Sequence, residues 1–234
     1  MNKLPNTVSS VTRRTVLTGT AGLGLATLAG TPALADRRLD AQALITQAQA
    51  TVQNFRADTN MQWVRTNLGK AKAVLVVPQS VKGGFIIGGS GGTGVLMTRR
   101  TADWSAPAFY TIGSFTFGLQ IGGEVSELLL MVMTDRGVER LLTSTFKLGA
   151  DLSVAAGPVG AGAKAQTVDV LAFARTKGLY GGINVEGAVI KIRNDYNEDY
   201  YDRRNIRPRD ILTGNTVSAP EAAGLRQALL DLER

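Results

Sequence analysis

The sequence predicts an α+β fold in which helices lie near both ends of one domain and a long run of antiparallel, glycine-rich strands lies between them. Apolar residues recur at three- and four-residue spacing over residues 39–55 and again after Pro220. Between residues 73 and 192 the apolar residues alternate with polar ones or form short continuous runs. Separate blocks of helices and strands are typical of the α+β class, and we expect a sheet or a barrel-like arrangement.

The N-terminal region predicts two helices. The first carries an apolar stripe opposite a face rich in glutamine, made by Ala41, Leu44, Ile45, Ala48, Val52 and Phe55. The second begins with Asp58 or Thr59 as its N-cap and ends before Gly69, because glycine commonly terminates helices. Its buried residues are expected to be Met61, Val64 and Leu68.

The strands are expected at residues 74–77, 85–97, 110–123, 128–133, 152–156, 168–174 and 179–192. Residues 135–137 and 176–178 are expected to be turns, with one or two helical turns following the first of them. The last helix follows Pro220 and carries a stripe of Ala222, Leu225, Leu229 and Leu232.

Residues 1–35 predict a twin-arginine signal peptide. Arg13 and Arg14 precede a mildly apolar stretch, and residues 33–35 read Ala-Leu-Ala, a pattern that signal peptidase accepts. The mature domain would be residues 36–234, with a core of about 39–215 and a C-terminal helix of about 220–233. An ordinary secretory signal and an uncleaved anchor are the alternatives. We expect an exported protein, periplasmic or envelope-associated, or secreted where the source has one membrane.

The composition narrows the chemistry. The net charge of +7 includes three charges from Lys3, Arg13 and Arg14, which leaves +4 after cleavage and gives little support to a nucleic-acid partner. The chain has no cysteine and no histidine, so disulfides, thiol nucleophiles, serine-histidine triads and the commonest transition-metal ligand are excluded. We expect no enzyme activity, no cofactor, no metal and no nucleotide.

A glycine-rich segment has the spacing of a dinucleotide-binding loop, with Gly89, Gly91 and Gly94 at the key positions. That loop requires a helix after its last glycine, whereas the apolar residues 95–97 predict a strand. We therefore predict closely packed strands. We also expect Gly91→Ala to lower stability, through crowding or a positive φ.

A hydrolase is the least favoured alternative. A serine-lysine dyad would use Lys82 or Lys177. A pair of catalytic carboxylates would come from Glu124, Glu127, Asp151 and Glu186, but the sequence does not indicate which two. Solvated surface side chains explain these residues better.

Several segments occur in the order found in one known family. They are residues 71–78, 82–85, 104–109, 118–122, 148–153 with Gly157 and Pro158, and 177–182. Together, over about residues 39–215, they resemble the SYLF domain, also called the actin-binding domain of a yeast endocytic protein. The resemblance implies lipid binding, because eukaryotic members bind phosphoinositides with an N-terminal amphipathic helix implicated. A fungal branch binds and bundles actin filaments.

The first predicted helix is the corresponding candidate for binding anionic phospholipid or a membrane surface. Its candidate lipid-binding residues are Arg37, Arg38, Leu44, Ile45, Val52 and Phe55. Two arginines beside an apolar stripe suit an anionic leaflet. The alternative is that the β core covers the stripe.

An acidic, aromatic and then basic segment near residue 200 is the second candidate site. It is expected to be a surface loop that binds an envelope protein through Tyr196, Tyr200, Tyr201, Arg203 and Arg204. The alternative is that the tyrosines tether the loop to the core. The sequence therefore leaves two hypotheses: a lipid-binding domain, or a protein-interaction module that does not bind lipid.

Overall fold

The computed structural model describes residues 32–84, 87–117, 124–143, 145–157, 168–176 and 185–234. The predicted signal peptide up to residue 31 lies outside these residues, as do the motifs at 118–122 and 177–182 and the expected turn at 177–178. The first helix begins at Pro32, so cleavage after Ala35 would cut within its first turn.

The N-terminal helices are confirmed. The first, α1 (Pro32–Ala57), extends beyond the predicted range at both ends. The second consists of consecutive short segments: η1 (Thr59–Met61), α2 (Gln62–Asn67) and η2 (Leu68–Lys70). Its predicted end before Gly69 is wrong, because Gly69 lies within η2 and the helical turns end at Lys70. The Asp58 side chain accepts a hydrogen bond from the backbone of Asn60, as expected of an N-cap.

The strands form one sheet of eight described strands in the order β5-β8-β3-β2-β1-β4-β7-β6. Their bounds are β1 (Ala73–Gly84), β2 (Ile87–Thr98), β3 (Ala108–Phe117), β4 (Glu124–Val132), β5 (Thr145–Lys147), β6 (Val154–Ala156), β7 (Val170–Thr176) and β8 (Val189–Ile192). All neighbours are antiparallel except β6 and β7, which run parallel, so the sheet is mixed. The predicted fold class is confirmed.

The centre of β1 contains a bulge at Pro78 and Gln79. The pairing of β1 with both β2 and β4 changes register there, because proline has no N–H to donate to the ladder. Beside the bulge β2 approaches β1 closely: a Cβ on Gly94 would lie 2.7 Å from the Val76 carbonyl oxygen. Gly91 is different, since its nearest contact would be an ordinary 3.5 Å to the carbonyl oxygen of Ile112. The prediction that alanine at position 91 would be crowded is therefore wrong. Alanine would be crowded at position 94.

The second half contains helices that the sequence analysis missed or misplaced. Residues 135–137, expected to be a turn, begin α3 (Asp135–Leu141), because the Thr134 hydroxyl accepts from the Gly137 N–H and caps it. The expected loop near residue 200 is α5 (Asn194–Tyr201), and α6 (Pro208–Leu212) follows it. The predicted C-terminal helix is present as η3 (Pro220–Ala222) and α7 (Ala223–Leu232).

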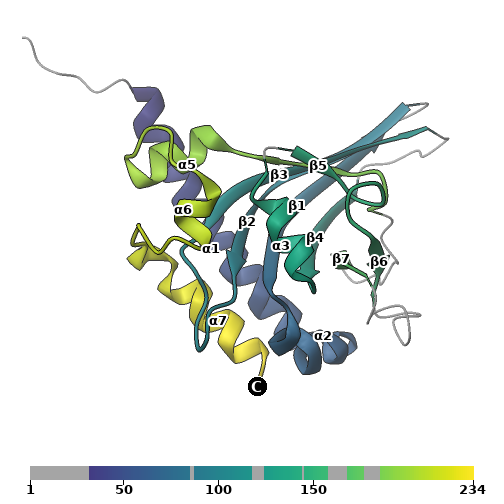
Figure 1. Ribbon diagram of the computed structural model, residues 1–234. Coiled ribbons are helices and arrows are strands. Elements are labelled where there is room, and N and C mark those ends of the chain that lie inside the picture. Colours follow the sequence, from purple (N-terminus) through teal and green to yellow (C-terminus); the bar gives the residue numbers. More distant parts are fainter. Residues whose placement is uncertain (1–31, 85–86, 118–123, 144, 158–167, 177–184) are drawn as a thin grey trace, which may run out of the picture. The chain divides into compact units, whose positions relative to one another are not determined.

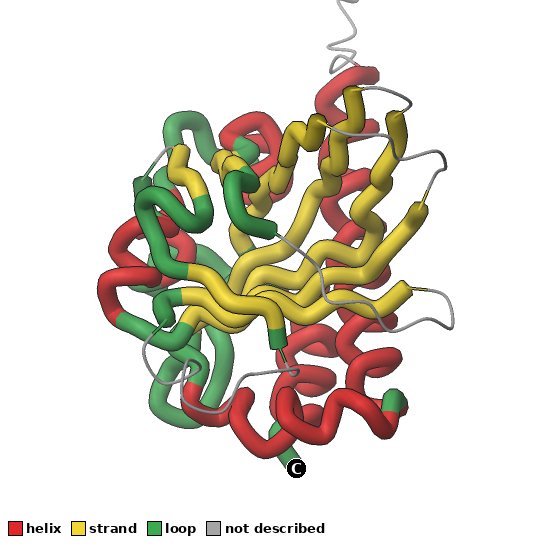
Figure 2. Tube along the Cα trace, turned by 90° about the vertical axis from the view of Figure 1, so that its right-hand side faces the viewer, coloured by secondary structure: helices red, strands yellow, loops and turns green. Residues whose placement is uncertain are grey.

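Helices α1 and α7 pack side by side, and α1 lies across β1 and β2 (Figure 1). Figure 2 shows this helical layer along one side of the twisted strands. Neighbouring residues of β3 show that both faces of the sheet are covered at this strand. The Phe109 ring contacts Tyr200 of α5, while the Tyr110 hydroxyl donates to the Leu141 carbonyl of α3 at 2.6 Å.

No helix in the described part of the chain combines the length and the apolar character that a membrane span requires.

Candidate functional site

The apolar stripe of α1 lies inside the domain. Ile45, Val52 and Phe55 are at most 2% exposed and belong to the core, and Leu44 is half-buried against it. Of the two alternatives for this stripe, the structure shows cover by the sheet and α7. Ile45, Val52 and Phe55 are therefore not available to a lipid surface in this structure, and Leu44 is only partly accessible.

The first turns of α1 contain the side chains that do reach solvent. Leu39 is 63% exposed, the largest fraction among the exposed large hydrophobic residues of the described chain. Arg38 beside it is exposed, whereas the Arg37 Nε atom lies 2.9 Å from a carboxylate oxygen of Asp199 on α5. Sequence reasoning missed Leu39 because periodicity alone does not show which apolar residue at a helix end remains uncovered.

A buried polar side chain, that of Asn197, joins helix α5 to the start of β3. The Asn197 side-chain oxygen accepts from the Phe109 N–H at 2.9 Å, although Asn197 lies in a polar sequence with no apolar stripe. Such a pair satisfies backbone groups at the entry of β3 that burial would otherwise leave unpaired. A contact across 88 positions in the chain is not visible as a local sequence pattern.

The tyrosines of α5 act as tethers in this structure. Tyr200 is 5% exposed, and the Tyr201 hydroxyl donates to the Pro107 carbonyl at 2.6 Å. Burial raises the pKa of both hydroxyls, and Glu221 adds to the effect at Tyr200. Tyr196 lies under Arg193, whose guanidinium carbon is 3.9 Å from the ring centroid.

Of the five candidate partner-binding residues, Arg203 and Arg204 are exposed. They follow Asp202, whose left-handed backbone, with φ of 48°, ends α5. Asp199, which pairs with Arg37 of α1, also lines a small hollow with both arginines, so they lie near the start of α1. We call this region the α1–α5 surface and define it by its exposed side chains Arg38, Leu39, Arg203 and Arg204.

The α1–α5 surface has mixed charge. A small hollow of about 130 Å³ on it is lined by Glu198, Asp199, Asp202, Arg203 and Arg204. The acidic residues of α5 offset much of the positive field, so attraction to an anionic surface would be modest. An exposed leucine beside arginine is suited to shallow, reversible contact with a bilayer or with a partner protein.

A second pocket, of about 460 Å³, lies between α1 and the strands β4 and β7. Its polar centre is Glu127, which accepts from Asn54 at 2.7 Å and from Arg175 at 2.8 Å. Arg175 also pairs with Asp58 at 3.3 Å. One arginine thus bridges two carboxylates, and such a hydrogen-bonded network joins α1 to the sheet.

The other candidate hydrolase residues have separate environments. Asp151 accepts from the backbone N–H of Lys147 at 2.7 Å, and Glu186 is exposed. Lys177 lies outside the described residues, and at Lys82 and Glu124 the structure describes the backbone alone. No group of three or more acidic side chains within the described ranges could hold a metal ion.

These features define a class of protein: an α+β domain with a curved mixed sheet, a helical layer on it and exposed surfaces suited to binding. Residues 113–232 match the profile of the family described as Ysc84, Las17-binding protein actin regulator. The chain belongs to this family, as the SYLF resemblance predicts.

Similar proteins occur in animals and fungi. The chain is 32% identical over 169 residues to the human SH3 domain-containing YSC84-like protein 1, with 69% of this chain and 49% of the relative covered. It is 30% identical over 171 residues to Protein YSC84 of Saccharomyces cerevisiae, with 69% and 36% covered. The chain thus spans half or less of these relatives' length.

Proposed function

We propose that the chain is an exported, non-catalytic domain of the bacterial cell envelope that binds anionic phospholipid through the α1–α5 surface. The exposed Leu39 beside Arg38 carries this proposal, because it puts an apolar side chain and an exposed cationic side chain at the start of the helix that the family resemblance implicates in lipid binding. The proposed lipid contact therefore lies at the first turns of α1 and not at the apolar stripe, which is buried.

The expected affinity is low. Burying one leucine side chain contributes about 1.5–3 kcal/mol, and each arginine near an anionic surface adds about 1 kcal/mol. The acidic residues of α5 reduce that sum. Binding should therefore require anionic lipid and low salt, since the Debye length shortens to about 3 Å at 1 M.

Vesicle flotation of the mature chain tests the proposal. We expect binding to phosphatidylglycerol vesicles and little to phosphatidylcholine vesicles. Leu39→Ser should weaken binding by about tenfold or more, whereas Val189→Ser, which changes another exposed apolar residue, should not. Arg38→Gln should weaken it about fivefold, with Arg56→Gln on the same helix as the charge-matched control.

Absence of binding to anionic vesicles at low salt would remove the lipid proposal. The alternative would then be a protein-interaction module that uses the exposed Arg203 and Arg204. The names of the relatives refer to Las17 and actin regulation. We propose that this chain shares their fold but not those partners, because an exported domain does not meet them.

Export has its own test. Replacing both Arg13 and Arg14 by lysine should leave precursor in the cytoplasm, because the twin-arginine receptor reads that pair. Mass spectrometry of the exported wild-type chain should find Asp36 at its N-terminus. Unimpaired export of the double variant would instead indicate an ordinary secretory signal.

A further inference from the structure

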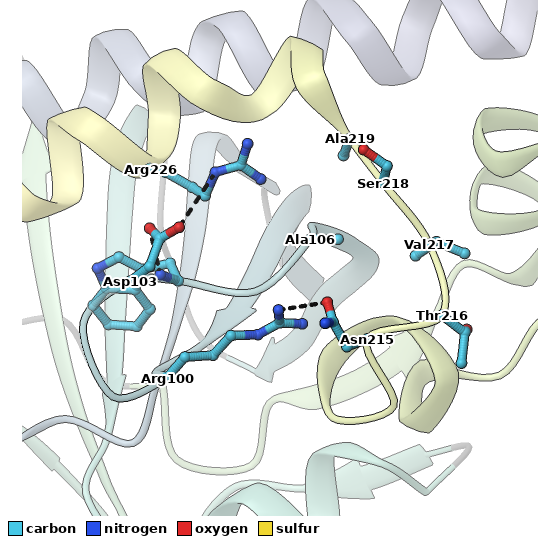
Figure 3. A pocket seen from close by; sticks show the side chains of 10 residues that line it. Arg100, Asp103, Ala106, Asn215, Thr216, Val217, Ser218, Ala219 and Arg226 are labelled. Atoms are coloured by element: carbon cyan, nitrogen blue, oxygen red, sulfur yellow. Dashed lines mark hydrogen bonds and ion pairs between the residues drawn. The ribbon is translucent and has the colours of Figure 1, made fainter.

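A pocket of about 450 Å³ opens where the connection from β2 to β3 meets the segment before η3 and the helix α7. Figure 3 shows Arg100 reaching Asn215 and Arg226 of α7 reaching Asp103 within this pocket. It shares no residue with the α1–α5 surface, and the proposed function does not use it. Its volume lies in the usual range of small-molecule sites.

Two consecutive arginines at the end of β2 have contrasting partners. Arg99 pairs with the Glu233 carboxylate at 2.6 Å, donates to the Leu68 and Ala71 carbonyls and stacks on the Trp104 ring. Arg100 has no carboxylate within 4 Å in the described chain, and its Nη1 donates to the neutral Asn215 side chain at 2.6 Å. Arg100 therefore has a neutral amide oxygen as its hydrogen-bond partner, at a position where an anionic oxygen would bind more strongly.

Two further donors in the pocket wall lack partners. The Arg100 Nη2 and Trp104 Nε1 atoms are buried and make no hydrogen bond in the described structure. Unpaired buried donors cost free energy, more so on a charged group, and an unsatisfied group in a native fold calls for an explanation. A ligand that accepts hydrogen bonds and carries negative charge would remove this cost.

The second cation of the pocket is Arg226, whose Nε lies 4.0 Å from the nearer Asp103 oxygen. That separation is too long for a hydrogen bond, so the pair leaves the guanidinium able to bind another acceptor. The other Asp103 oxygen accepts from the Trp104 N–H at 2.7 Å. The pocket wall therefore contains two arginines and one acidic side chain, which gives it a net charge of +1.

The segment that closes the pocket can adapt. Asn215 has a left-handed backbone, with φ of 51°, and residues 213–216 are exposed. A modest shift of Asn215 would release Arg100 Nη1 and give a ligand access to Nη2. The amide oxygen of Asn215 thus occupies the position that an anionic oxygen would take.

We propose that this pocket binds a phosphate ester, with Arg100 and Arg226 as its two cationic contacts and Asn215 as the group that the ligand displaces. Guanidinium groups bind phosphate through paired hydrogen bonds, and a phosphate offers more acceptor oxygens than a carboxylate to donors on several sides. The ester belongs either to a soluble metabolite or to a phospholipid headgroup.

Calorimetric titration of the mature protein with glycerol 3-phosphate and with inorganic phosphate tests the soluble source. We expect saturable millimolar binding that Arg100→Gln and Arg226→Gln each weaken by about tenfold. Arg204→Gln, an equal change of charge outside the pocket, should have little effect. Asp103→Asn should tighten binding, because it removes the opposing charge and keeps the oxygen that accepts from Trp104.

Flotation with phosphatidylglycerol vesicles tests the headgroup source. Vesicle binding that depends on Arg100 and is competed by glycerol 3-phosphate supports the pocket even if soluble ligands bind weakly. Vesicle binding that depends on Leu39 but not on Arg100 or Arg226 supports only the α1–α5 surface. If neither ligand form depends on Arg100 or Arg226, in variants that melt like the wild type, the phosphate pocket is refuted.

Discussion

Gly94→Ala probes the close approach of β2 to the bulged strand β1. The added methyl group would lie 2.7 Å from the Val76 carbonyl oxygen and 2.8 Å from Val77 Cγ2. Both neighbours are buried, so neither can move without disturbing the core. Overpacking of this kind costs about 1–3 kcal/mol.

Gly91→Ala in the same strand is the matched control. Its methyl group would meet only the Ile112 carbonyl oxygen at 3.5 Å, and Gly91 is not among the described glycines with positive φ. Alanine should therefore stabilise the protein by about 0.4–1 kcal/mol, because it restricts the unfolded chain. The two variants should differ in free energy of unfolding by about 1.4–4 kcal/mol.

Urea unfolding of the mature protein measures this difference. With an m-value of about 2 kcal/mol/M, the midpoints of the two variants should differ by about 0.7–2 M. Equal midpoints, or a Gly94→Ala variant as stable as the wild type, would refute the close packing at the bulge. The same result would weaken the argument that these glycines serve packing rather than a ligand.

Three further predictions concern buried groups. Burial alone would raise the pKa of Asp169, but hydrogen bonds from Thr134 and Ser153 and the charge of Arg136 lower it. The ionised Asp169 should therefore stabilise the fold above about pH 4, and this contribution should be lost as the pH falls through the lower folded pKa. Asp169→Asn should lower the free energy of unfolding by about 1.5–3 kcal/mol at pH 7 and by less in acid. Urea denaturation at both pH values measures this difference. Burial raises the pKa of Tyr110, so stability should fall above about pH 10, and Tyr110→Phe should reduce that fall; an unchanged alkaline melting curve would contradict this. Ile45→Asp should lower stability by about 3 kcal/mol or more in a melting experiment, whereas lipid-facing placement of Ile45 would leave the melting temperature nearly unchanged.

Local periodicity predicted the elements that bury one apolar stripe. It located α1, the short helices after it and α7, and the buried residues Met61 and Leu229 are where the spacing put them. It missed α5, because Asn194–Tyr201 has no apolar periodicity and is held by the long-range contact of Asn197 with β3. The parallel pairing of β6 with β7 was missed for the same reason, since strand partners are tertiary information.

The candidate sites show a similar limit. The sequence predicted the helix α1 and its apolar stripe, but it could not tell that the stripe is covered and that Leu39 is exposed. The pocket at Arg100 was not predicted at all. Its walls come from positions 115 apart in the chain, and an arginine is recognised as unpaired only after its neighbours are known.

The packing of α7 on α1 has a consequence for the order of events during synthesis. Helix α1 is made first and α7 last among the described elements, and Gly224 of α7 approaches the Gln49 side chain of α1 so closely that a Cβ would collide with it. The hydrogen-bonded pair of Arg99 with Glu233 likewise joins the sheet to the residue after α7. The helical layer therefore cannot be completed on a nascent chain before α7 has left the ribosome. The proposed twin-arginine route, which normally carries folded cargo, would then receive the domain only after α7 has been made and packed on α1.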